Sequence, residues 1–282
     1  MTEFEIQCFN DLYAKFEAGE RVEALQELRD LARRLDDPWD RAFSLYHETL
    51  FLAEMAETSQ ARSRLEELKG AVASLTDPPP DAYQNNYPIS LTVMARYAEI
   101  LILLAERNEP LALQVLEELV SRYPKHLAMP DSWGIERDIQ VQRGYLLADA
   151  GRWREAKPFL ENAFPPDVWK SVTCYYLGHC YYELHEYERA RMKLVEALDL
   201  GLVGHWEGKA RYVLGIVEYH LSDIKAAKTQ FELCVQTAGP EYLGQTRVWE
   251  WLEATSRKLG LQDEAEMYRR RRMDPQPDSK LN

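Results

Sequence analysis

Histidine and cysteine are the side chains of this sequence that could bind a metal ion or act as nucleophiles. His179 and Cys180 are adjacent, and adjacent side chains on a helix point about 100° apart, so these two cannot hold one ion together. His179 and Glu183 are four residues apart and share a helix face, but there is no HExxH pattern and no second histidine at a suitable spacing. The ligand spacings of structural zinc are also missing. We therefore predict no metal site.

The sequence also lacks the patterns of cofactor and catalytic sites. It has no GxGxxG, no Walker-type loop and no GxSxG elbow. Most carboxylates lie beside lysine or arginine, as Glu155 and Lys157 do around Ala156, which is typical of solvated helix faces. We therefore predict a protein that is not an enzyme and needs no cofactor. The cysteines form no CxxC pair and are typical of reduced, partly buried thiols in a cytosolic protein; they are Cys8, Cys174, Cys180 and Cys234.

Charge and hydropathy limit the class of partner. The net charge is −13 and the pI is about 5.1, which argues against a general nucleic-acid partner because phosphate binding depends on basic surface. The acidic N-terminal stretch does not resemble a secretory signal, and the most apolar run, residues 100–105, is far too short to span a bilayer. We therefore predict a cytoplasmic protein without a membrane partner.

One local cluster of charge stands out, the arginine run 269–272. It has two interpretations. The run is compatible with the basic end of a C-terminal helix, where cations interact favourably with the helix dipole and face water. Alternatively, it forms a contact site for an acidic partner, nucleic acid or anionic lipid. Four successive arginines spread around a helix and make a poor flat patch, which favours the first interpretation.

A sequence repeat indicates which secondary-structure elements carry these side chains. Seven alanines recur in the second half of helix-length apolar patterns, at spacings of 37, 51, 44, 34, 37 and 38 residues. A period in this range predicts stacked helical hairpins rather than a globule with a private pocket. Leu, Ala and Glu far outweigh Val, Ile and Thr, which also favours helix. The recurring alanines are Ala24, Ala61, Ala112, Ala156, Ala190, Ala227 and Ala265.

Each unit divides into two amphipathic segments joined by a short polar turn, so the two helices must be antiparallel neighbours. Gly144, Gly178 and Gly215 occupy the same place in three successive first helices. Glycine inside a helix costs roughly 1 kcal/mol relative to alanine. We therefore expect the second helix to cross close to each of these glycines.

These positions resemble the tetratricopeptide repeat family over nearly the whole chain, with degenerate copies around Ala24, Ala61 and Ala265. The resemblance implies an all-α, right-handed superhelical solenoid of about seven antiparallel helix pairs. The best copy supplies Cys174, Leu177, Gly178, Tyr181, Ala190, Leu194 and Ala197; the next supplies Leu214, Gly215, Ala227, Phe231, Cys234 and Pro240; earlier copies supply Gly144, Leu147, Ala156, Leu160 and Ala163, and Leu103, Leu116, Leu119 and Pro124.

We predict a single solenoid domain over residues 1–272 and a disordered tail over 273–282. A proline-rich insertion at 76–88 and further insertions at 125–134 and 201–208 interrupt the repeat, and they either carry binding contacts or adjust the angle between units. The predicted units lie near residues 5–38, 42–75, 93–126, 137–168, 171–204, 208–241 and 246–272.

In the proteins that this chain resembles, the first helices of successive units line a concave groove. Tyrosines in such positions suit recognition, and lysine and arginine among them would suit a peptide with acidic residues. The family's clamp for acidic C-termini needs Lys and Asn one turn apart, and Tyr175 and His179 stand there instead, so that activity is not expected. The groove residues so predicted, each with packing between repeats as the alternative, are Tyr97, Tyr145, Tyr175, His179, Tyr182, Lys209, Tyr212, Tyr219 and Arg247.

The leading hypothesis is a non-enzymatic protein–protein interaction module, or adaptor, that holds a protein or peptide in this groove. A second hypothesis is a peptide-responsive regulatory protein whose curvature changes on binding, although the chain shows no effector domain of its own. A third is an acidic chaperone or immunity factor that shields a basic client, for which the net charge of −13 is the support.

Overall fold

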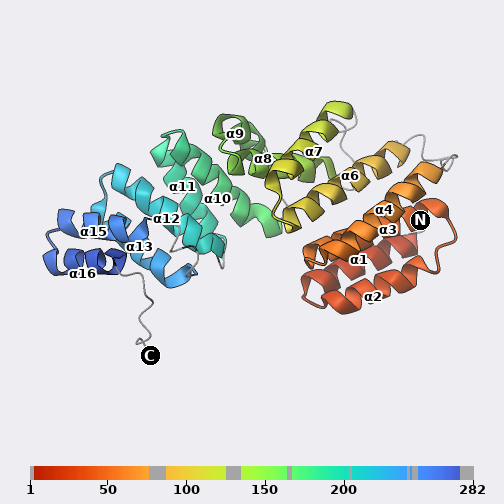
Figure 1. The fold of residues 1–282 in the computed structure, drawn as a ribbon, viewed down its shortest axis with the longest axis horizontal. Helices are drawn as coiled ribbons and strands as arrows, with labels where there is room; N and C mark the ends of the chain where they lie inside the picture. Colours follow the sequence, from red (N-terminus) through yellow and green to blue (C-terminus); the bar gives the residue numbers. More distant parts are fainter. Residues whose placement is uncertain are drawn as a thin grey trace. The chain divides into compact units, whose positions relative to one another are not determined.

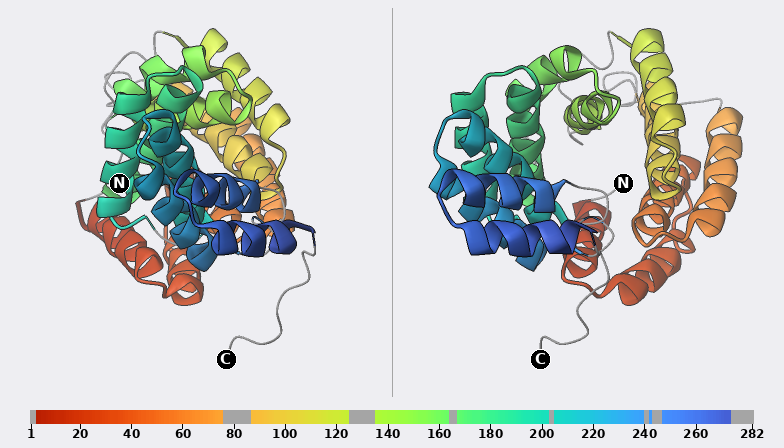
Figure 2. Two further views of the ribbon diagram at one scale, coloured as in Figure 1. Left: turned by 90° about the vertical axis from the view of Figure 1, so that its left-hand side faces the viewer. Right: turned by 60° about the vertical axis from the view of Figure 1, so that its left-hand side comes forward.

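The computed structural model describes residues 3–75, 87–124, 135–163, 167–202, 205–239, 242 and 247–273. Within these ranges the regular structure consists of fourteen α-helices (Figure 1). The helices follow one another as pairs, and the two helices of pairs such as α3–α4 and α15–α16 lie side by side in every view (Figures 1 and 2). The predicted fold class, an all-α helical-repeat solenoid of antiparallel pairs, is confirmed.

The helices fall into two compact units, Met1–Ile139 and Gln140–Asn282, and the division lies within α8. Unit 1 contains α1 (Glu3–Glu17), α2 (Arg21–Ala32), α3 (Pro38–Glu54), α4 (Thr58–Ser74), α6 (Tyr87–Ala105) and α7 (Glu109–Arg122). Unit 2 contains most of α8 (Ile135–Asp149), then α9 (Trp153–Glu161), α10 (Asp167–Glu183), α11 (Tyr187–Asp199), α12 (His205–His220), α13 (Ile224–Thr237), α15 (Val248–Lys258) and α16 (Gln262–Met273).

The same turn joins the two helices of every pair. Five residues before each recurring alanine, one residue takes a positive φ between 58° and 96°. The amide of the next residue then donates to a carbonyl five residues earlier, as Glu186 N does to Tyr181 O at 2.8 Å, which is the helix-ending Schellman pattern. Because this geometry reverses the chain within a few residues, it sets where each second helix begins. The residues with positive φ are Gly19, Ala56, Arg107, Gly151, His185, Ser222 and Gly260.

The recurring alanines all lie at the contacts between helices. None of the seven side chains is more than 2% exposed, so their assignment to the core is confirmed. A larger side chain at these places would push the helices apart, because protein interiors are close-packed. The repeated alanine is therefore a steric requirement of the pair.

The three glycines in register mark where the second helix crosses the first most closely. A Cβ atom on Gly144, Gly178 or Gly215 would lie 2.6–2.7 Å from a side-chain atom of the second helix, which is closer than real Cβ contacts. The facing residues are Leu160, Leu194 and Phe231, respectively. The expectation of close packing at these glycines is confirmed.

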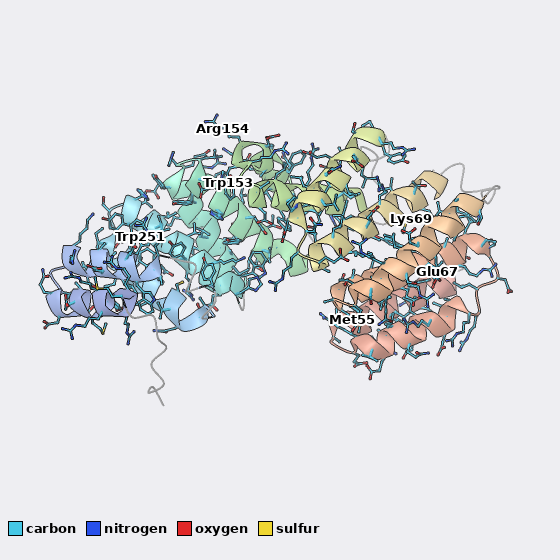
Figure 3. The ribbon with its side chains drawn as sticks, viewed as in Figure 1. Met55, Glu67, Lys69, Trp153, Arg154 and Trp251 are labelled. Atoms are coloured by element: carbon cyan, nitrogen blue, oxygen red, sulfur yellow. The ribbon has the colours of Figure 1, made fainter. Side chains whose placement is uncertain are left out.

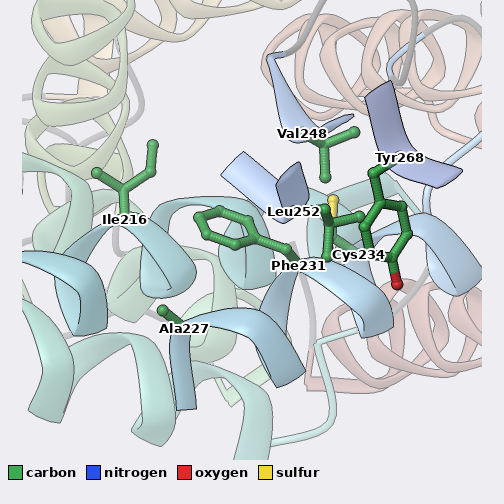
Figure 4. Close-up of a cluster of buried hydrophobic side chains, with 7 residues drawn as sticks. All are labelled: Ile216, Ala227, Phe231, Cys234, Val248, Leu252 and Tyr268. Carbon is green, nitrogen blue, oxygen red and sulfur yellow. The ribbon is translucent and has the colours of Figure 1, made fainter. Parts of the chain in front are cut away.

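Apolar side chains from successive pairs form a continuous core within unit 2. Around Phe231, which is fully buried, α12, α13, α15 and α16 contribute one cluster (Figure 4). Each buried Phe or Leu in such a cluster contributes roughly 1.5–3 kcal/mol by removal from water. The cluster therefore joins the last two helix pairs. It comprises Ile216, Ala227, Phe231, Cys234, Val248, Leu252 and Tyr268.

Ion pairs also connect one helix pair to the next. Three of the cations stand directly after a recurring alanine: Arg62 pairs with Glu106 at 2.5 Å, Lys157 with Glu186 at 2.6 Å, and Lys228 with Glu264 at 2.8 Å. Of the two residues expected on a solvated face, Glu155 is exposed and pairs with Arg152, while the partly exposed Lys157 reaches the next pair. Partly exposed pairs of this kind stabilise by about 0–1 kcal/mol each, so they adjust the packing rather than cause it.

Unit 1 contains a buried histidine in an aromatic pocket. The His47 ring lies 4.3 Å from the Phe43 ring and 5.1 Å from the Phe9 ring, and its Nδ1 is 2.7 Å from the Tyr13 hydroxyl. Its Nε2 atom is buried without a hydrogen-bond partner in the described part of the chain. Burial lowers the pKa of His47 to about 3, so the ring is neutral at physiological pH.

Several predictions about the insertions and the tail concern residues outside the described ranges. This applies to the insertion at 125–134, to residues 76–86 of the proline-rich insertion, to 203–204 and to the tail from 274. The assignment of one domain to residues 1–272 stays a prediction. Among the described residues, none of the helices has the length and apolar character that crossing a membrane requires.

We expect Gly178→Ala to destabilise the protein by about 1–3 kcal/mol. The added Cβ would lie 2.7 Å from Leu194 Cγ and 3.1 Å from the Leu194 backbone nitrogen, so a change of rotamer alone cannot relieve the clash. Gly70→Ala is the matched control, because a Cβ on Gly70 in α4 meets nothing within 4 Å, and it should stabilise by about 0.5–1 kcal/mol. Urea unfolding measures both changes, and effects of the same sign would contradict the close crossing.

We also expect His47 to make unit 1 lose stability in acid. Its pKa is about 3 when folded and near 6.5 when unfolded, so below about pH 6.5 the unfolded chain binds the extra proton. The free energy of unfolding should then fall by roughly 1.4 kcal/mol for each pH unit between these values, and His47→Phe should remove this component. Urea unfolding of both proteins at pH 7 and pH 5 measures it. An equal loss of stability in both proteins would show that His47 is not responsible.

Candidate functional site

Unit 2 carries a continuous row of partly or fully exposed aromatic rings, which we call the aromatic stripe. Successive ring centroids along it lie 4.8, 6.0, 6.5, 4.7, 6.3 and 5.0 Å apart. The distances are typical of ring–ring contacts. The stripe consists, in spatial order, of Trp153, His179, Tyr182, Tyr187, His220, Tyr219 and Trp251, none of which is buried.

The turns between paired helices position this stripe. Trp153 and Tyr187 are the first residues of α9 and α11, and each stands three residues before a recurring alanine. Trp153 contacts His179 of the next pair, and Tyr187 stacks flat on His220 of the next pair, with an angle of 3° between the ring planes. The stripe therefore follows the edge of the repeat where first helices end and second helices begin.

A hollow of about 430 Å³ adjoins the Trp153 end of the stripe. It lies between the α8–α9 and α10–α11 turns (Figure 3 labels Trp153 and Arg154). Its acids already have partners, because Glu155 pairs with Arg152 at 2.7 Å and Glu183 lies 3.5 Å from His179 Nε2. The lining residues are Gly151, Arg152, Trp153, Arg154, Glu155, Glu183, Leu184 and His185.

The other end of the stripe carries a lysine over an aromatic ring. The Lys258 Nζ atom lies 4.0 Å from the centroid of the Tyr219 ring, and Tyr219 in turn contacts Trp251. Lys258 is the last residue of α15 and is exposed. Such a cation–π contact contributes about 0.5–1 kcal/mol at an exposed site and leaves the ammonium free to bind another group.

Three residues predicted for the groove lie inside the packing. Tyr97, Tyr145 and Tyr175 are each no more than 8% exposed. The Tyr145 hydroxyl is 2.5 Å from Thr173 Oγ1, and the Tyr175 hydroxyl is 3.4 Å from His179 Nδ1. Burial raises the pKa of both phenols, so they stay protonated. Here packing between repeats, the alternative considered for each tyrosine, describes the environment better than contact with a partner.

The other six predicted residues keep some exposure but do not form one surface. His179, Tyr182 and Tyr219 belong to the aromatic stripe. Lys209 lies over the Trp206 ring at 4.5 Å, near the opposite end of α12.

The last two of the six, Tyr212 and Arg247, lie together. Tyr212 packs against Phe231, and its hydroxyl accepts the Arg247 backbone N–H at 3.4 Å. The Arg247 side chain is 76% exposed and pairs with Glu250. Assignment of a binding role to these residues stays a prediction.

Sequence reasoning missed Trp153, Tyr187, His220 and Trp251. For the first two a signal was present, because both lie three residues before a recurring alanine. His220 and Trp251 gave no comparable signal. Their place in the stripe depends on which ring of a neighbouring helix pair they meet, and that is a property of the folded chain.

The three cysteines of unit 2 are buried thiols. Burial raises the pKa of the Cys174 thiol to about 11 and those of Cys180 and Cys234 to about 12, so none is an activated nucleophile. Among the described residues, no group of three or more histidine, cysteine or acidic side chains could hold a metal ion. The two arginines 271 and 272 fold back onto α15, where Arg272 pairs with buried Glu253 and Arg271 lies over Trp249.

Comparison with known proteins bears on the fold. No protein-family model matches the sequence, and no curated protein matches it either. A structure from a functional characterization of Pseudomonas aeruginosa pilF matches with a TM-score of 0.56 at 15% identity, over 85% of this chain and 95% of that chain. The apo form of RapI matches with a TM-score of 0.59 at 12% identity, over 99% of this chain and 78% of that chain.

A Rap protein complexed with competence and sporulation factor matches with a TM-score of 0.59 at 13% identity, over 96% of this chain and 76% of that chain. These structures are tetratricopeptide repeat proteins. At such low identity the likeness shows the fold alone, an all-α helical-repeat solenoid.

His220 is the exposed ring of the stripe, so it should matter little for stability. We expect His220→Ala to change the free energy of unfolding by less than about 1 kcal/mol, because the ring is exposed and contacts the rings of Tyr187 and Tyr219 from outside the core. Phe231→Ala, which empties a fully buried site, should cost about 3–5 kcal/mol. Urea unfolding of the two variants measures the difference. Similar costs would assign the stripe to the core.

Proposed function

We propose that this chain is a non-enzymatic interaction module that binds a protein or peptide along the aromatic stripe of unit 2, and that it acts in the cytoplasm. The observation that carries the proposal is the unbroken contact of seven rings, one exposed and six half-buried, across successive helix pairs. Rings that already touch one another lose little side-chain entropy on binding, which suits a recognition surface. Reduced cysteines support the cytoplasmic location.

The shape of the stripe favours an extended partner over a small molecule. It runs from turn to turn along one edge of the unit rather than enclosing a deep cavity. Tyrosine, tryptophan and histidine together offer apolar faces and polar edges, so they can contact both the side chains and the backbone of a peptide. The hollow beside Trp153 would then receive one side chain of the partner.

A regulatory role is the second candidate. The likeness to RapI and to the Rap complex covers 99% and 96% of this chain, respectively. By analogy, binding along the stripe would change the packing between helix pairs and so the contacts offered to an effector. A scattering profile that stays constant when a bound peptide is added would count against this candidate.

The charge distribution favours a third role, the binding of a basic client by unit 1. Residues 1–139 contain 14 Lys and Arg against 26 Asp and Glu, a net charge of −12, so nearly all of the charge of −13 belongs to unit 1. A surface of one sign attracts oppositely charged partners over roughly a Debye length, about 8–10 Å in physiological salt. Loss of client binding at moderate salt would favour this role.

The test of the leading proposal is selection from a display library of short random peptides against the whole chain. Peptides that are selected should bind a variant with His179→Ala, Tyr187→Ala and His220→Ala about 100-fold more weakly, because each exposed aromatic contact contributes roughly 1 kcal/mol. Fluorescence anisotropy with labelled synthetic copies measures the affinity.

The matched control is a triple alanine variant of Met192, Val195 and Leu200, exposed apolar residues of α11 and of the position directly after it in the same unit. It should bind the selected peptides with unchanged affinity. Equal losses in both variants, or full binding by the stripe variant, would overturn the proposal.

A further inference from the structure

The two ends of the aromatic stripe carry cations without an acidic partner. Arg154 is exposed beside Trp153, and Lys258 is exposed over Tyr219. Neither side chain forms an ion pair with any carboxylate in the part of the chain that the structure describes. Other arginines and lysines of the described ranges also form no such pair, but Arg154 lines the hollow at the Trp153 end and Lys258 lies directly over a ring of the stripe.

The neighbouring charges are already engaged. At the Trp153 end, Arg152 pairs with Glu155. At the Tyr219 end, Arg257 pairs with buried Glu253 at 2.6 Å. Arg154 also lines the hollow of about 430 Å³ that adjoins Trp153, so a carboxylate entering the hollow meets one uncommitted cation.

The acidic groups near the middle of the stripe are engaged as well. Glu183 lies beside His179, and Glu186 pairs with Lys157 and Arg189. Asp223 accepts the Ala226 backbone N–H at the start of α13. The acidic groups named here are therefore engaged, and Arg154 and Lys258 are the cations that this inference assigns to a partner.

We infer that the partner is an extended peptide segment with an acidic residue near each end and apolar or aromatic residues between them. One carboxylate pairs with Arg154 in the hollow, the other pairs with Lys258, and the central residues lie on the rings. This assignment rests on the proposed function of the stripe and specifies the chemistry of its partner. Carboxylate contacts at both ends would also fix how far along the stripe the segment lies.

The length of the segment follows from the ring spacing. Six steps of 4.7–6.5 Å between centroids cannot span more than about 35 Å, the length of about ten extended residues at ~3.3 Å each. The two acidic residues are therefore separated by at most about ten residues, and by fewer where the stripe bends.

Selection from the random peptide library tests the inference with position-specific variants of the whole chain. Arg154→Met and Lys258→Met each remove one charge and keep an unbranched apolar side chain. Against the unaltered chain, the selected peptides should be enriched in Asp or Glu at two separated positions. Each variant should lose the enrichment at one position and keep the other, and each should bind synthetic copies of the original peptides about fivefold more weakly.

Lys225→Met is the control, because Lys225 is an exposed lysine of α13 outside the stripe, and it should keep both enriched positions. Circular dichroism should show the same helix content in all three variants. Two outcomes would overturn the inference and leave the proposed function standing. In the first, the selected peptides depend on the stripe but carry no acidic pair; in the second, neither substitution changes the enrichment of that pair. Selection that is absent, or unaffected by the alanine variant of the stripe, overturns both.

Discussion

The close crossing of the two helices in each pair is the constraint on which the rest of this structure depends. Every pair has an alanine at the contact between its helices, and its small side chain lets the helices approach closely. These recurring alanines are at most 2% exposed. In three pairs the first helix also has a glycine at the crossing, and a side-chain atom of the second helix lies only 2.6–2.7 Å from the place that a glycine Cβ would take. The close approach requires a sharp turn, which the residue with positive φ five positions before each alanine provides.

The crossing also determines where functional side chains can be. Because the turn begins each second helix at a constant distance from the alanine, the first residue of that helix always lies at the same edge. In two successive pairs this residue is aromatic, Trp153 and then Tyr187, and each meets a histidine of the following pair. The position of the turn therefore places these two aromatic residues in one row with the histidines that they contact. The ion pairs made by the residues after the alanines are a second consequence of the same register.

The fold was predictable from the sequence because its determinants are local and repeated. The spacing of the alanines predicts the helix pairs, and the three glycines in register predict the closest crossings. The surface was less predictable. Tyr175 and His179 are one turn apart on α10, yet the first is buried and the second is half-buried, because neighbouring pairs cover one side of the helix more than the other. The stripe forms because rings of consecutive helix pairs contact one another, and the pattern of residues in the sequence does not predict such contacts.

The two units differ in net charge, which the composition of the whole chain does not reveal. A net charge of −13 describes an acidic protein, but unit 2, with 20 Lys and Arg against 21 Asp and Glu, is nearly neutral. The excess of acidic residues therefore belongs to unit 1, whereas the stripe lies in the unit whose charges nearly balance.

The central claim, that the aromatic stripe is the contact surface, is tested most directly by fluorine NMR of the chain labelled with 5-fluorotryptophan. The sequence has seven tryptophans, of which Trp153 and Trp251 lie at the two ends of the stripe and Trp39 is buried in unit 1. On titration with a peptide obtained by selection, the resonances of Trp153 and Trp251 should shift together with one dissociation constant while that of Trp39 stays in place. Unchanged resonances for Trp153 and Trp251 in the presence of bound peptide would contradict the account.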